Sequence, residues 1–203
     1  MFLRCIMRGP VIENYDQNFD NWNGAIAYLD RDGVLNYGSP NYINSPEELN
    51  IIDGVKESIL SLRKLGYKIV IVTNQSAIMR GLWDEKQLKL IHQKLIEEIG
   101  HIEAIITCPH RNRDGCNCRK PKPGMLFAGS NLLRGASHED VNWFADKPVP
   151  INELDLMVGD RNSDMGAGWA VGARLFQVNE HLGLPSVINR IIEGDEGDDF
   201  SPV

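Results

Sequence analysis

The sequence lacks a hydrophobic run of the roughly 20 residues that a membrane-spanning helix needs. Its first ten residues, MFLRCIMRGP, are too short and too interrupted by Arg4 and Arg8 to be a secretory signal. It also lacks an excess of positive charge, since 21 Lys and Arg stand against 28 Asp and Glu, a net charge of −7. Such a chain is poorly suited to binding nucleic acid or anionic lipid. We therefore expect a cytoplasmic protein with neither nucleic acid nor a membrane as its partner, and we separately expect a monomer.

Cysteines are few, four in all, and in the cytoplasm they are expected as thiols or metal ligands rather than disulfides. Cys108 and His110 stand one residue apart, and Cys116 and Cys118 follow after a gap of five. Three thiolates and one imidazole form a complete ligand set for a structural, tetrahedral Zn²⁺. The loop between them has little apolar material, so a metal would supply its stability. The alternative is a reduced cysteine loop without metal. Cys5 lies outside the pattern and is expected to be an ordinary thiol.

With 203 residues, of which 42% are hydrophobic, the chain is long enough for one domain with a sizeable core. Strand and helix patterns alternate from residue 25 to residue 192, which indicates an α/β fold with a parallel sheet and helices on both faces. The expected strands are 25–29, 67–72, 102–107, 154–160 and 174–178, and the expected helices are 53–66, 83–100, 123–133, 163–172 and 185–192. We expect residues 1–24 to be an N-terminal extension and residues 193–203 to be a disordered acidic tail.

Polar and charged residues follow several of the expected strands. They are Asp30 and Asp32 after the first, Thr73 and Asn74 at the second, Arg119 and Lys120 after the third, and Asp160 and Asp164 after the fourth. Because ligands of open α/β sheets bind at the carboxyl ends of the strands, we expect these side chains to meet. Carboxylates crowded together suit Mg²⁺, and a nearby lysine and hydroxyl suit phosphate oxygens, so the set predicts phosphoryl transfer.

Each of these motifs alone has an ordinary structural interpretation. Asp and Gly are common in turns, so the LDRDG segment could be only a strand followed by a turn. Thr73 and Asn74, or Asp164, could simply cap a helix. Lys120 could be a solvated surface lysine. The four motifs in one order favour a functional site over these alternatives.

Together the motifs D-x-D-G, T-N, a downstream Lys and G-D-x-x-x-D resemble those of the haloacid dehalogenase-like (HAD) phosphatases. The resemblance implies that Asp30 is the nucleophile and that Asp32 is the general acid and base. It implies that Thr73, Asn74 and Lys120 bind the phosphoryl group. The implied Mg²⁺ ligands are Asp30, the backbone carbonyl of Asp32 and Asp160, with Asp164 supporting them.

The cysteine loop followed by C-R-K-P narrows the resemblance to two HAD families, the D-glycero-D-manno-heptose 1,7-bisphosphate phosphatases and the histidinol-phosphate phosphatases. The segments TNQSAIMRG, DGVLN and CRKPKPGML are more similar to the heptose family. The short gap between the zinc ligand pairs, and Arg161, are more similar to the histidinol-phosphate family. We therefore expect a sugar-phosphate phosphatase that removes the C7 phosphate of the heptose bisphosphate, with histidinol phosphate as the alternative substrate.

The spacing between the motifs leaves no room for a large cap domain, so we expect an open site whose short loops determine specificity. Arg80 and Arg119 are candidates for binding a second anionic group, although Arg80 could instead face solvent. Two other functions stay open. One is a phosphatase for nucleic-acid 3′ ends, which the acidic charge disfavours, and the other is a zinc-stabilised binding module without activity. The connection 134–153, with Trp143 and Phe144, has no role that the sequence decides.

Overall fold

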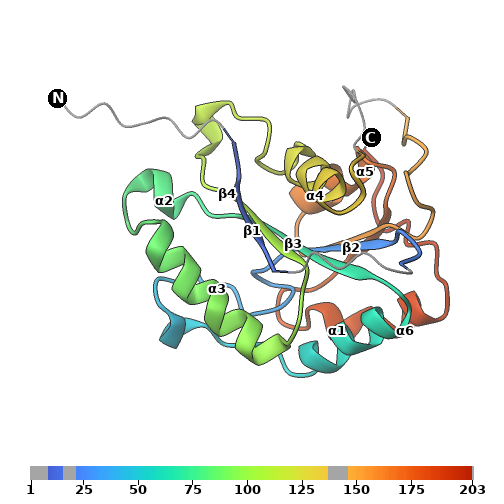
Figure 1. Cartoon of the computed structure of the whole chain (residues 1–203), viewed down its shortest axis with the longest axis horizontal. Helices are drawn as coiled ribbons and strands as arrows, with labels where there is room; N and C mark the ends of the chain where they lie inside the picture. Colours follow the sequence, from blue (N-terminus) through green and yellow to red (C-terminus); the bar gives the residue numbers. More distant parts are fainter. Residues whose placement is uncertain (1–8, 16–21, 137–145, 203) are drawn as a thin grey trace.

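The computed structural model describes residues 9–15, 22–136 and 146–202. Its centre is a six-stranded sheet with the strand order β1-β4-β3-β2-β5-β6 (Figure 1). Every neighbouring pair is parallel except β1 with β4. The strands are β1 (Val11–Asn14), β2 (Ile26–Leu29), β3 (Lys68–Asn74), β4 (Ala104–Cys108), β5 (Leu156–Gly159) and β6 (Arg174–Gln177).

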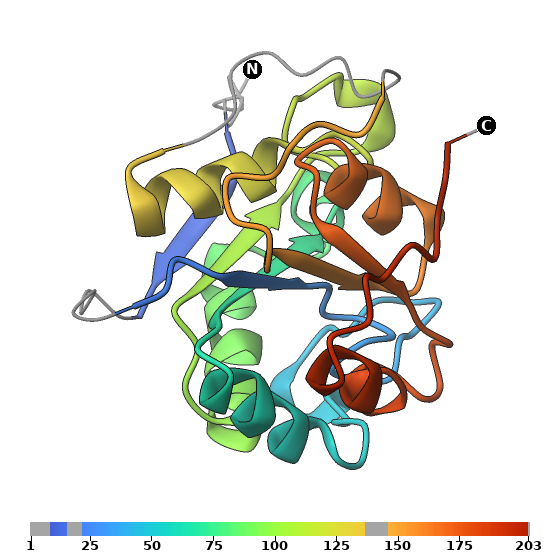
Figure 2. The same ribbon diagram turned by 90° about the vertical axis from the view of Figure 1, so that its right-hand side faces the viewer.

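Helices cover both faces of the sheet, as the alternating sequence pattern predicts. On one face lie α1 (Val55–Lys64), α3 (Glu85–Ile99) and α6 (Ile188–Ile192), and on the other lie α4 (Gly124–Arg134) and α5 (Asn162–Trp169) (Figure 2). The remaining helical elements are short: α2 (Ala77–Arg80), η1 (Pro46–Glu48), η2 (Asn112–Asp114) and η3 (Leu184–Ser186). One apolar cluster fills the space between the sheet and the helices on each face, so there are two such clusters.

The first residues of α3 and α1 illustrate how the local sequence determines where a helix begins. Asp84 caps α3, because its side chain accepts hydrogen bonds from the backbone N–H groups of Lys86 and Gln87. The start of α1 differs from the expected one. Gly54, in the left-handed conformation, precedes the first helical residue, Val55, and no side chain caps the helix, so Asp53 does not have the capping role that its position suggests.

The N-terminal segment contributes a strand that the sequence patterns do not predict. Residues 11–14 form the antiparallel edge strand β1, and Val11 pairs with Thr107 of β4. Only one side of β1 has a strand partner, so it is half exposed and has no continuous apolar run to reveal it. The extension therefore completes the sheet.

The acidic tail is placed differently from the disordered segment that we expected. Gly197 accepts a backbone hydrogen bond from Leu175, and Asp198 bridges to the same residue of β6. Arg190 binds Asp199 at 2.8 Å and Asp195 at 2.8 Å. The acidic side chains thus pair with a cation on α6, and neutralisation removes the repulsion that favours disorder.

No cap domain interrupts residues 30–103, where the chain forms only η1, α1, β3, α2 and α3 between the strand ends. This confirms the open architecture over that stretch. None of the helices in the described residues combines the length and the apolar character of a membrane span. Cys5, which is expected to be an ordinary thiol, and Trp143 and Phe144, to which the sequence assigns no role, lie outside the described residues.

Glu103 is a buried acid directly before β4 that links this strand to β3 and to α1. Its side chain is 2% exposed, and its carboxylate accepts from the Ile69 N–H at 2.7 Å and from Arg63 at 2.8 Å. Replacing Glu103 with alanine would leave the Ile69 N–H without a buried acceptor. We expect Glu103→Ala to lower the free energy of unfolding by about 2 kcal/mol in urea titrations. Glu103→Gln keeps an acceptor and should cost clearly less; equal losses would contradict this role.

Candidate active site

Asp30 and Lys120 meet at the carboxyl end of the sheet. Asp30 directly follows β2, and its Oδ1 lies 2.7 Å from Lys120 Nζ. Lys120 Nζ also lies 2.6 Å from Asp164 Oδ1 and donates to the carbonyl oxygen of Val72 at 2.7 Å. Burial would lower the pKa of Lys120, but Asp164 and Asp30 outweigh this effect and raise it. The lysine is therefore a fixed cation at the centre of the site.

Three carboxylates surround that cation. One oxygen from each of Asp30, Asp160 and Asp164 can be chosen so that all lie within 4.8 Å of one another. Burial raises the pKa of Asp30 to about 7, and Asp164 adds to this effect while Lys120 opposes it. Burial, followed by the charge of Asp30, also raises the pKa of Asp160. Two cations face these three acids, Lys120 and Arg161, whose Nε lies 3.4 Å from Asp160 Oδ2. With all the acids ionised, negative charge stays uncompensated, which favours a bound cation.

The shape of this cluster fits Mg²⁺. Asp160 Oδ1 is buried and has no hydrogen-bond partner among the described residues. Gly33, with a φ of +81°, lets the backbone approach so closely that a Cβ there would lie 2.9 Å from Asp160 Oδ2. Asp164 is fixed through Oδ2, which accepts from the Arg161 N–H at 3.0 Å. Convergent oxygen donors with an open side are the kind of set that Mg²⁺ takes.

Asp32 is held by a ring of donors. Arg31 donates from Nε and Nη2 at 3.0–3.1 Å, Asn36 donates from Nδ2 at 2.9 Å, and Gln75 donates from Nε2 at 2.8 Å. Burial would raise the pKa of Asp32, but Arg31 and these hydrogen bonds outweigh it and lower the pKa. In this arrangement Asp32 is an ionised carboxylate with a 28% exposed side chain.

Thr73 and Asn74 lie at the end of β3, beside Lys120. Thr73 is 1% exposed, lines the active-site cavity, and accepts from Gln75 Nε2 at 2.9 Å. Asn74 binds the backbone of Lys120, accepting from its N–H at 3.2 Å and donating to its carbonyl at 3.3 Å. Asn74 thus joins the end of β3 to the loop that carries the lysine.

A cavity of about 440 Å³ opens above these groups. Its lining includes Asp30, Asp32, Asp164, Thr73, Asn74 and Lys120. The other lining residues are Gly38, Ser39, Pro40, Tyr42, Ile43, Ser76, Arg80, Asn112, Arg119, Arg161 and Ser163. Arg80 and Arg119, which were candidates for anion binding, therefore both reach the cavity. Tyr42 and Ser163 were not singled out as site residues, because a lone hydroxyl carries no motif, and Arg161 was noted only for its likeness to the histidinol-phosphate family.

The cavity continues into a cationic hollow at the zinc loop. This hollow shares Tyr42, Arg80 and Asn112 with the cavity and adds Arg111 and Arg113. Arg111 is paired with Asp114 at 2.9 Å, so its charge is partly neutralised. Arg113 is exposed, and after the hydrogen bonds from Arg111 its charge also helps to lower the pKa of Asp114. Positive charge therefore gathers on one side of the cavity opening.

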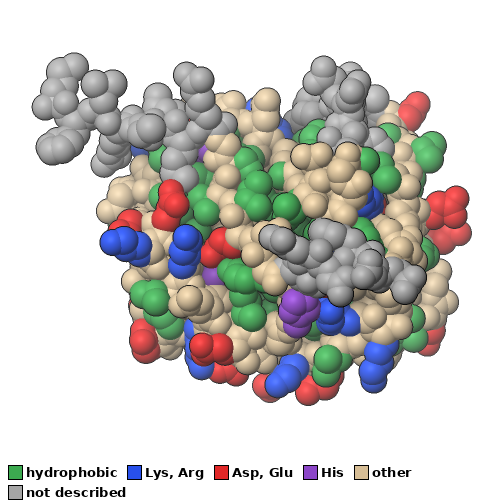
Figure 3. Space-filling model, viewed as in Figure 1, with side chains coloured by type: hydrophobic (Ala, Val, Ile, Leu, Met, Phe, Trp, Pro, Cys, Tyr) green, Lys and Arg blue, Asp and Glu red, His purple; other side chains and the backbone are tan. Residues whose placement is uncertain are grey.

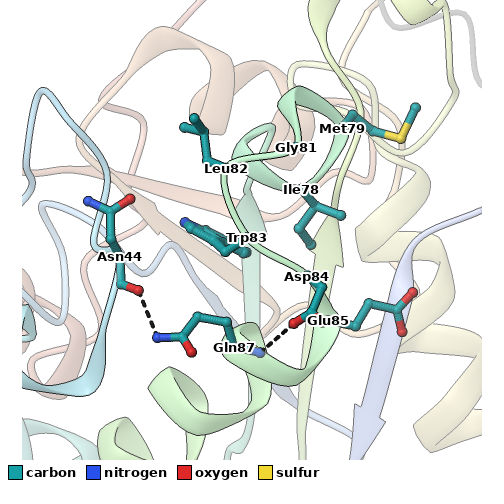
Figure 4. Close-up of a pocket in the computed structure, with 9 residues that line it drawn as sticks. All are labelled: Asn44, Ile78, Met79, Gly81, Leu82, Trp83, Asp84, Glu85 and Gln87. Carbon is teal, nitrogen blue, oxygen red and sulfur yellow. Dashed lines mark hydrogen bonds between the residues drawn. The ribbon is translucent and has the colours of Figure 1, made fainter.

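A separate hollow lies at the start of α3 (Figure 4). Its lining residues are Asn44, Ile78, Met79, Gly81, Leu82, Trp83, Asp84, Glu85 and Gln87. Gln87 Nε2 donates to the Asn44 carbonyl at 2.8 Å, and the Asp84 carboxylate caps the helix. Leu82 lines both this hollow and the cationic hollow. Because none of the strand-end motif residues lines it, we place the chemistry in the smaller, acid-lined cavity.

The zinc loop brings its four predicted ligands together. Cys108 Sγ lies 3.3 Å from Cys118 Sγ and 3.7 Å from Cys116 Sγ, and His110 Nδ1 lies 3.6 Å from Cys108 Sγ and 3.3 Å from Cys118 Sγ. The edges of a zinc tetrahedron with such ligands are about 3.5–3.8 Å long. The hydrogen bond with Cys118 lowers the pKa of Cys108 to about 6, although burial opposes this. The donor set and its spacing fit a structural Zn²⁺.

The loop also positions the residues that follow it. Arg119, directly after Cys118, donates to the carbonyl oxygen of His110 at 3.0 Å. Lys120 comes next in the chain and enters the acid cluster. A metal that fixes Cys118 would therefore fix the backbone from which both cations extend into the cavity.

On the face of the molecule that Figure 3 shows, positive and negative side chains do not form separate patches. Lysine and arginine side chains there are interspersed with aspartate and glutamate. A stripe of positive charge, which binding to a nucleic-acid backbone requires, is not seen on this face.

Comparisons with known proteins agree with the motifs. The model of the family described as polynucleotide kinase 3 phosphatase matches residues 26–143. The D-glycero-beta-D-manno-heptose-1,7-bisphosphate 7-phosphatase of Pseudomonas putida is 39% identical over 157 residues, which are 73% of this chain and 79% of that protein. The protein of the same name from Pseudomonas aeruginosa is 42% identical over 106 residues, 50% of this chain and 60% of that protein.

A solved structure extends the likeness to three dimensions. The D,D-heptose 1,7-bisphosphate phosphatase of B. bronchiseptica, complexed with magnesium and phosphate, superposes with a TM-score of 0.66 at 29% identity. The match covers 83% of this chain and 98% of that one. The resemblance that the motifs suggest is thereby confirmed at the level of the family, and the magnesium in that relative agrees with the acid cluster found in this chain.

Proposed function

The chain belongs to the D-glycero-beta-D-manno-heptose-1,7-bisphosphate 7-phosphatase family of the HAD-like phosphatases, and on that premise we propose that it hydrolyses the C7 phosphate of heptose 1,7-bisphosphate. One observation carries this proposal: the cavity that contains the acid–lysine cluster continues into the cationic hollow, so both ends of a bisphosphate can find cations. We assign the catalytic domain to residues 25–192.

Asp30 is the proposed nucleophile. Its carboxylate oxygen attacks phosphorus, the bond between phosphorus and the C7 oxygen breaks, and an aspartyl-phosphate forms on Asp30. Lys120 and Thr73 hold the phosphoryl oxygens during this transfer, and Asn74 keeps Lys120 in place. Mg²⁺, held by Asp30, Asp160 and the Asp32 carbonyl with Asp164 in support, would neutralise phosphoryl charge and favour the ionised form of Asp30.

Asp32 is the proposed general acid and base. It gives a proton to the departing C7 oxygen and later takes one from the water that attacks the aspartyl-phosphate, which regenerates Asp30 and releases inorganic phosphate. Its present hydrogen bonds favour the carboxylate form. Asp32 must therefore exchange some of these bonds for a proton and the leaving oxygen when substrate binds.

The two phosphates of the substrate explain the distribution of cations. The C7 phosphate would bind in the acid–lysine cluster, and the second phosphate would bind Arg80 and Arg119 at the cavity wall. Histidinol phosphate, the alternative substrate, carries an amine and an imidazole at its other end. The imidazole titrates near neutral pH, and both groups would be repelled by these arginines.

We accordingly expect kcat/KM for heptose 1,7-bisphosphate to exceed that for histidinol phosphate by at least about tenfold, or about 1.4 kcal/mol. Arg119→Ala should reduce kcat/KM mainly for the bisphosphate, because only that substrate offers a second phosphate. Zinc content should be measured on the same variant, since Arg119 also binds the zinc loop through the His110 carbonyl. Equal or reversed specificity constants in the wild-type protein would favour the histidinol-phosphate alternative.

We further propose that the protein works in the cytoplasm as a monomer and acts on neither nucleic acid nor membranes. The net charge of −7 supports the last two statements. A cysteine set arranged for metal rather than for disulfides supports the first.

A further inference from the structure

Five side chains near the carboxyl ends of β2, β3 and β4 each carry a buried polar atom without a hydrogen-bond partner in the described part of the chain. These atoms are Arg31 Nη1, Asn36 Oδ1, Gln75 Oε1, His92 Nε2 and Thr107 Oγ1. All five residues are at most 1% exposed. Buried polar groups in native proteins are almost always paired, so this concentration of unpaired atoms calls for an explanation.

Three of the five belong to the ring of donors around Asp32. Arg31, Asn36 and Gln75 all donate to the Asp32 carboxylate with one part of the side chain, and each leaves another polar atom unpaired. Thr107 lies beside Thr73 in the register of β3 and β4. Thr73 in turn accepts from Gln75, so Thr107 adjoins this ring.

His92 approaches the same region from α3. Its neighbours Ile91 and Leu95 pack in the apolar cluster on the α1–α3 face, together with Ile105 of β4. Thr107 stands two residues after Ile105 on β4, so its side chain faces the same helix layer. The charges of Arg31 and Asp32 also influence the pKa of the imidazole, which agrees with this placement. The ring is therefore buried on the side of the sheet from which the donors hold Asp32.

The other nitrogen of the imidazole has a defined partner. His92 Nδ1 lies 2.5 Å from Glu13 Oε2 on the edge strand β1. Burial has the largest effect on the pKa of His92 and lowers it, whereas the hydrogen bond with Glu13 raises it. The net effect is a lowered pKa, so the ring is neutral at neutral pH. A neutral ring that donates from Nδ1 to Glu13 has a lone pair on Nε2, which can accept a proton donor.

We propose that His92 is a positioning residue for Asp32 and acts through Arg31. In this arrangement an internal water accepts from Arg31 Nη1 and donates to His92 Nε2, and Asn36, Gln75 or Thr107 can supply its remaining contact. The chain Glu13–His92–water–Arg31 then fixes the guanidinium that holds the Asp32 carboxylate. The inference rests on the proposed acid–base role of Asp32.

The available groups suit such a water. A buried water needs two to four polar partners, and the unpaired atoms comprise one guanidinium donor, three acceptors and a hydroxyl that can do either. Without a partner, each buried group would cost free energy. The arrangement also gives β1 a part in catalysis, because Glu13 would orient the imidazole from a strand outside the motif region.

The test compares two substrates that differ in their need for a general acid. A sugar alkoxide must be protonated as it leaves, whereas p-nitrophenolate leaves as a stable anion. Because kcat/KM covers only the steps up to departure of the leaving group, it isolates this requirement. His92→Leu should lower kcat/KM by about tenfold for the sugar phosphate and by less than about threefold for p-nitrophenyl phosphate.

Two matched variants accompany this measurement. His92→Gln keeps an acceptor near the position of Nε2 and should recover most of the sugar-phosphate activity. Gln93→Leu, at the next, exposed position of α3, introduces the same apolar side chain and should change neither substrate. Equal losses on both substrates for His92→Leu, or no loss on either, would overturn the inference.

Asp32→Asn separates this inference from the proposed function. If Asp32→Asn shows the selective loss and His92→Leu does not, then only the positioning role fails. If Asp32→Asn itself shows no selectivity, the acid–base assignment fails. Should His92→Leu not fold, Glu13→Leu, which removes the acceptor for His92 Nδ1, provides the same comparison with the ring retained. A high-resolution crystal structure should show water between Arg31 Nη1 and His92 Nε2, and direct pairing of either atom with other protein groups would refute the inference.

Discussion

Asp30→Asn is expected to abolish Mg²⁺-dependent phosphate release, lowering kcat by on the order of 10³-fold or more. An amide at position 30 cannot form the aspartyl-phosphate. Asp164 also lies beside Lys120, at 2.6 Å, but its side chain is buried more deeply, 1% exposed against 11% for Asp30. Asp164 is fixed through its second oxygen by the Arg161 N–H, and Asp160 lies against Gly33. The measurement is phosphate release from heptose 1,7-bisphosphate at saturating Mg²⁺.

The fold should survive this substitution. Asparagine has nearly the same volume as aspartate, and removing one of three crowded acids relieves repulsion that raises the pKa of Asp30. The melting temperature of the Asp30→Asn protein should therefore be no lower than that of the wild type. Asp160→Asn serves as the comparison, because it should raise the Mg²⁺ concentration needed for activity while keeping the nucleophile. A rate above a few per cent of wild type for Asp30→Asn would rule out the covalent mechanism.

The second large effect is expected from loss of zinc. Purified protein that has not met a chelator should contain about one zinc per chain, and Cys118→Ser should reduce this to about a tenth or less, because one of only four ligands is lost. The zinc-free loop would have little apolar material to hold its shape, so the melting temperature should fall. Phosphatase activity should fall by more than about tenfold, since Arg119 and Lys120 follow Cys118 directly. Elemental analysis, calorimetry and kinetics on one preparation measure all three.

Cys5→Ser is the control for this experiment, because Cys5 lies outside the ligand pattern, and it should keep both the zinc and the activity. Added Zn²⁺ should not replace Mg²⁺ in the assay, since the all-oxygen acid cluster suits Mg²⁺ whereas thiolates and imidazole suit Zn²⁺. Protein that contains no zinc and is nevertheless fully active would contradict the structural role of the loop.

The sequence was sufficient for those parts of the site that depend on neighbouring residues. Asp30 and Asp32 stand at the end of a buried strand, and the zinc ligands stand in two close pairs on one loop. In both cases the chain itself brings the groups near one another. Alternation of strands and helices then predicts a parallel sheet, and the carboxyl ends of parallel strands share one edge, which unites Asp30, Lys120 and Asp160.

Other features depended on contacts between distant segments. β1 pairs with β4 across some 90 residues, and no apolar run reveals such a half-exposed edge strand. The acidic tail is ordered because Arg190 on α6 neutralises it. Composition reports the charge of a segment but not the presence of its partner, so the expectation of disorder was incorrect for the described part of the tail.

The surroundings of Asp32 show the same contrast between what local sequence specifies and what contacts between distant segments decide. By itself the sequence determined which residues meet at the strand ends and which form the cysteine–histidine cluster, because they stand in short motifs whose spacing is local. Only the tertiary structure decided what holds them. Arg31 and Gln75 surround Asp32, and His92 reaches the same region from a helix tied to Glu13 on the edge strand. The hydrogen-bond partners of a buried polar side chain depend on contacts between distant segments, and no local spacing in the sequence specifies those contacts.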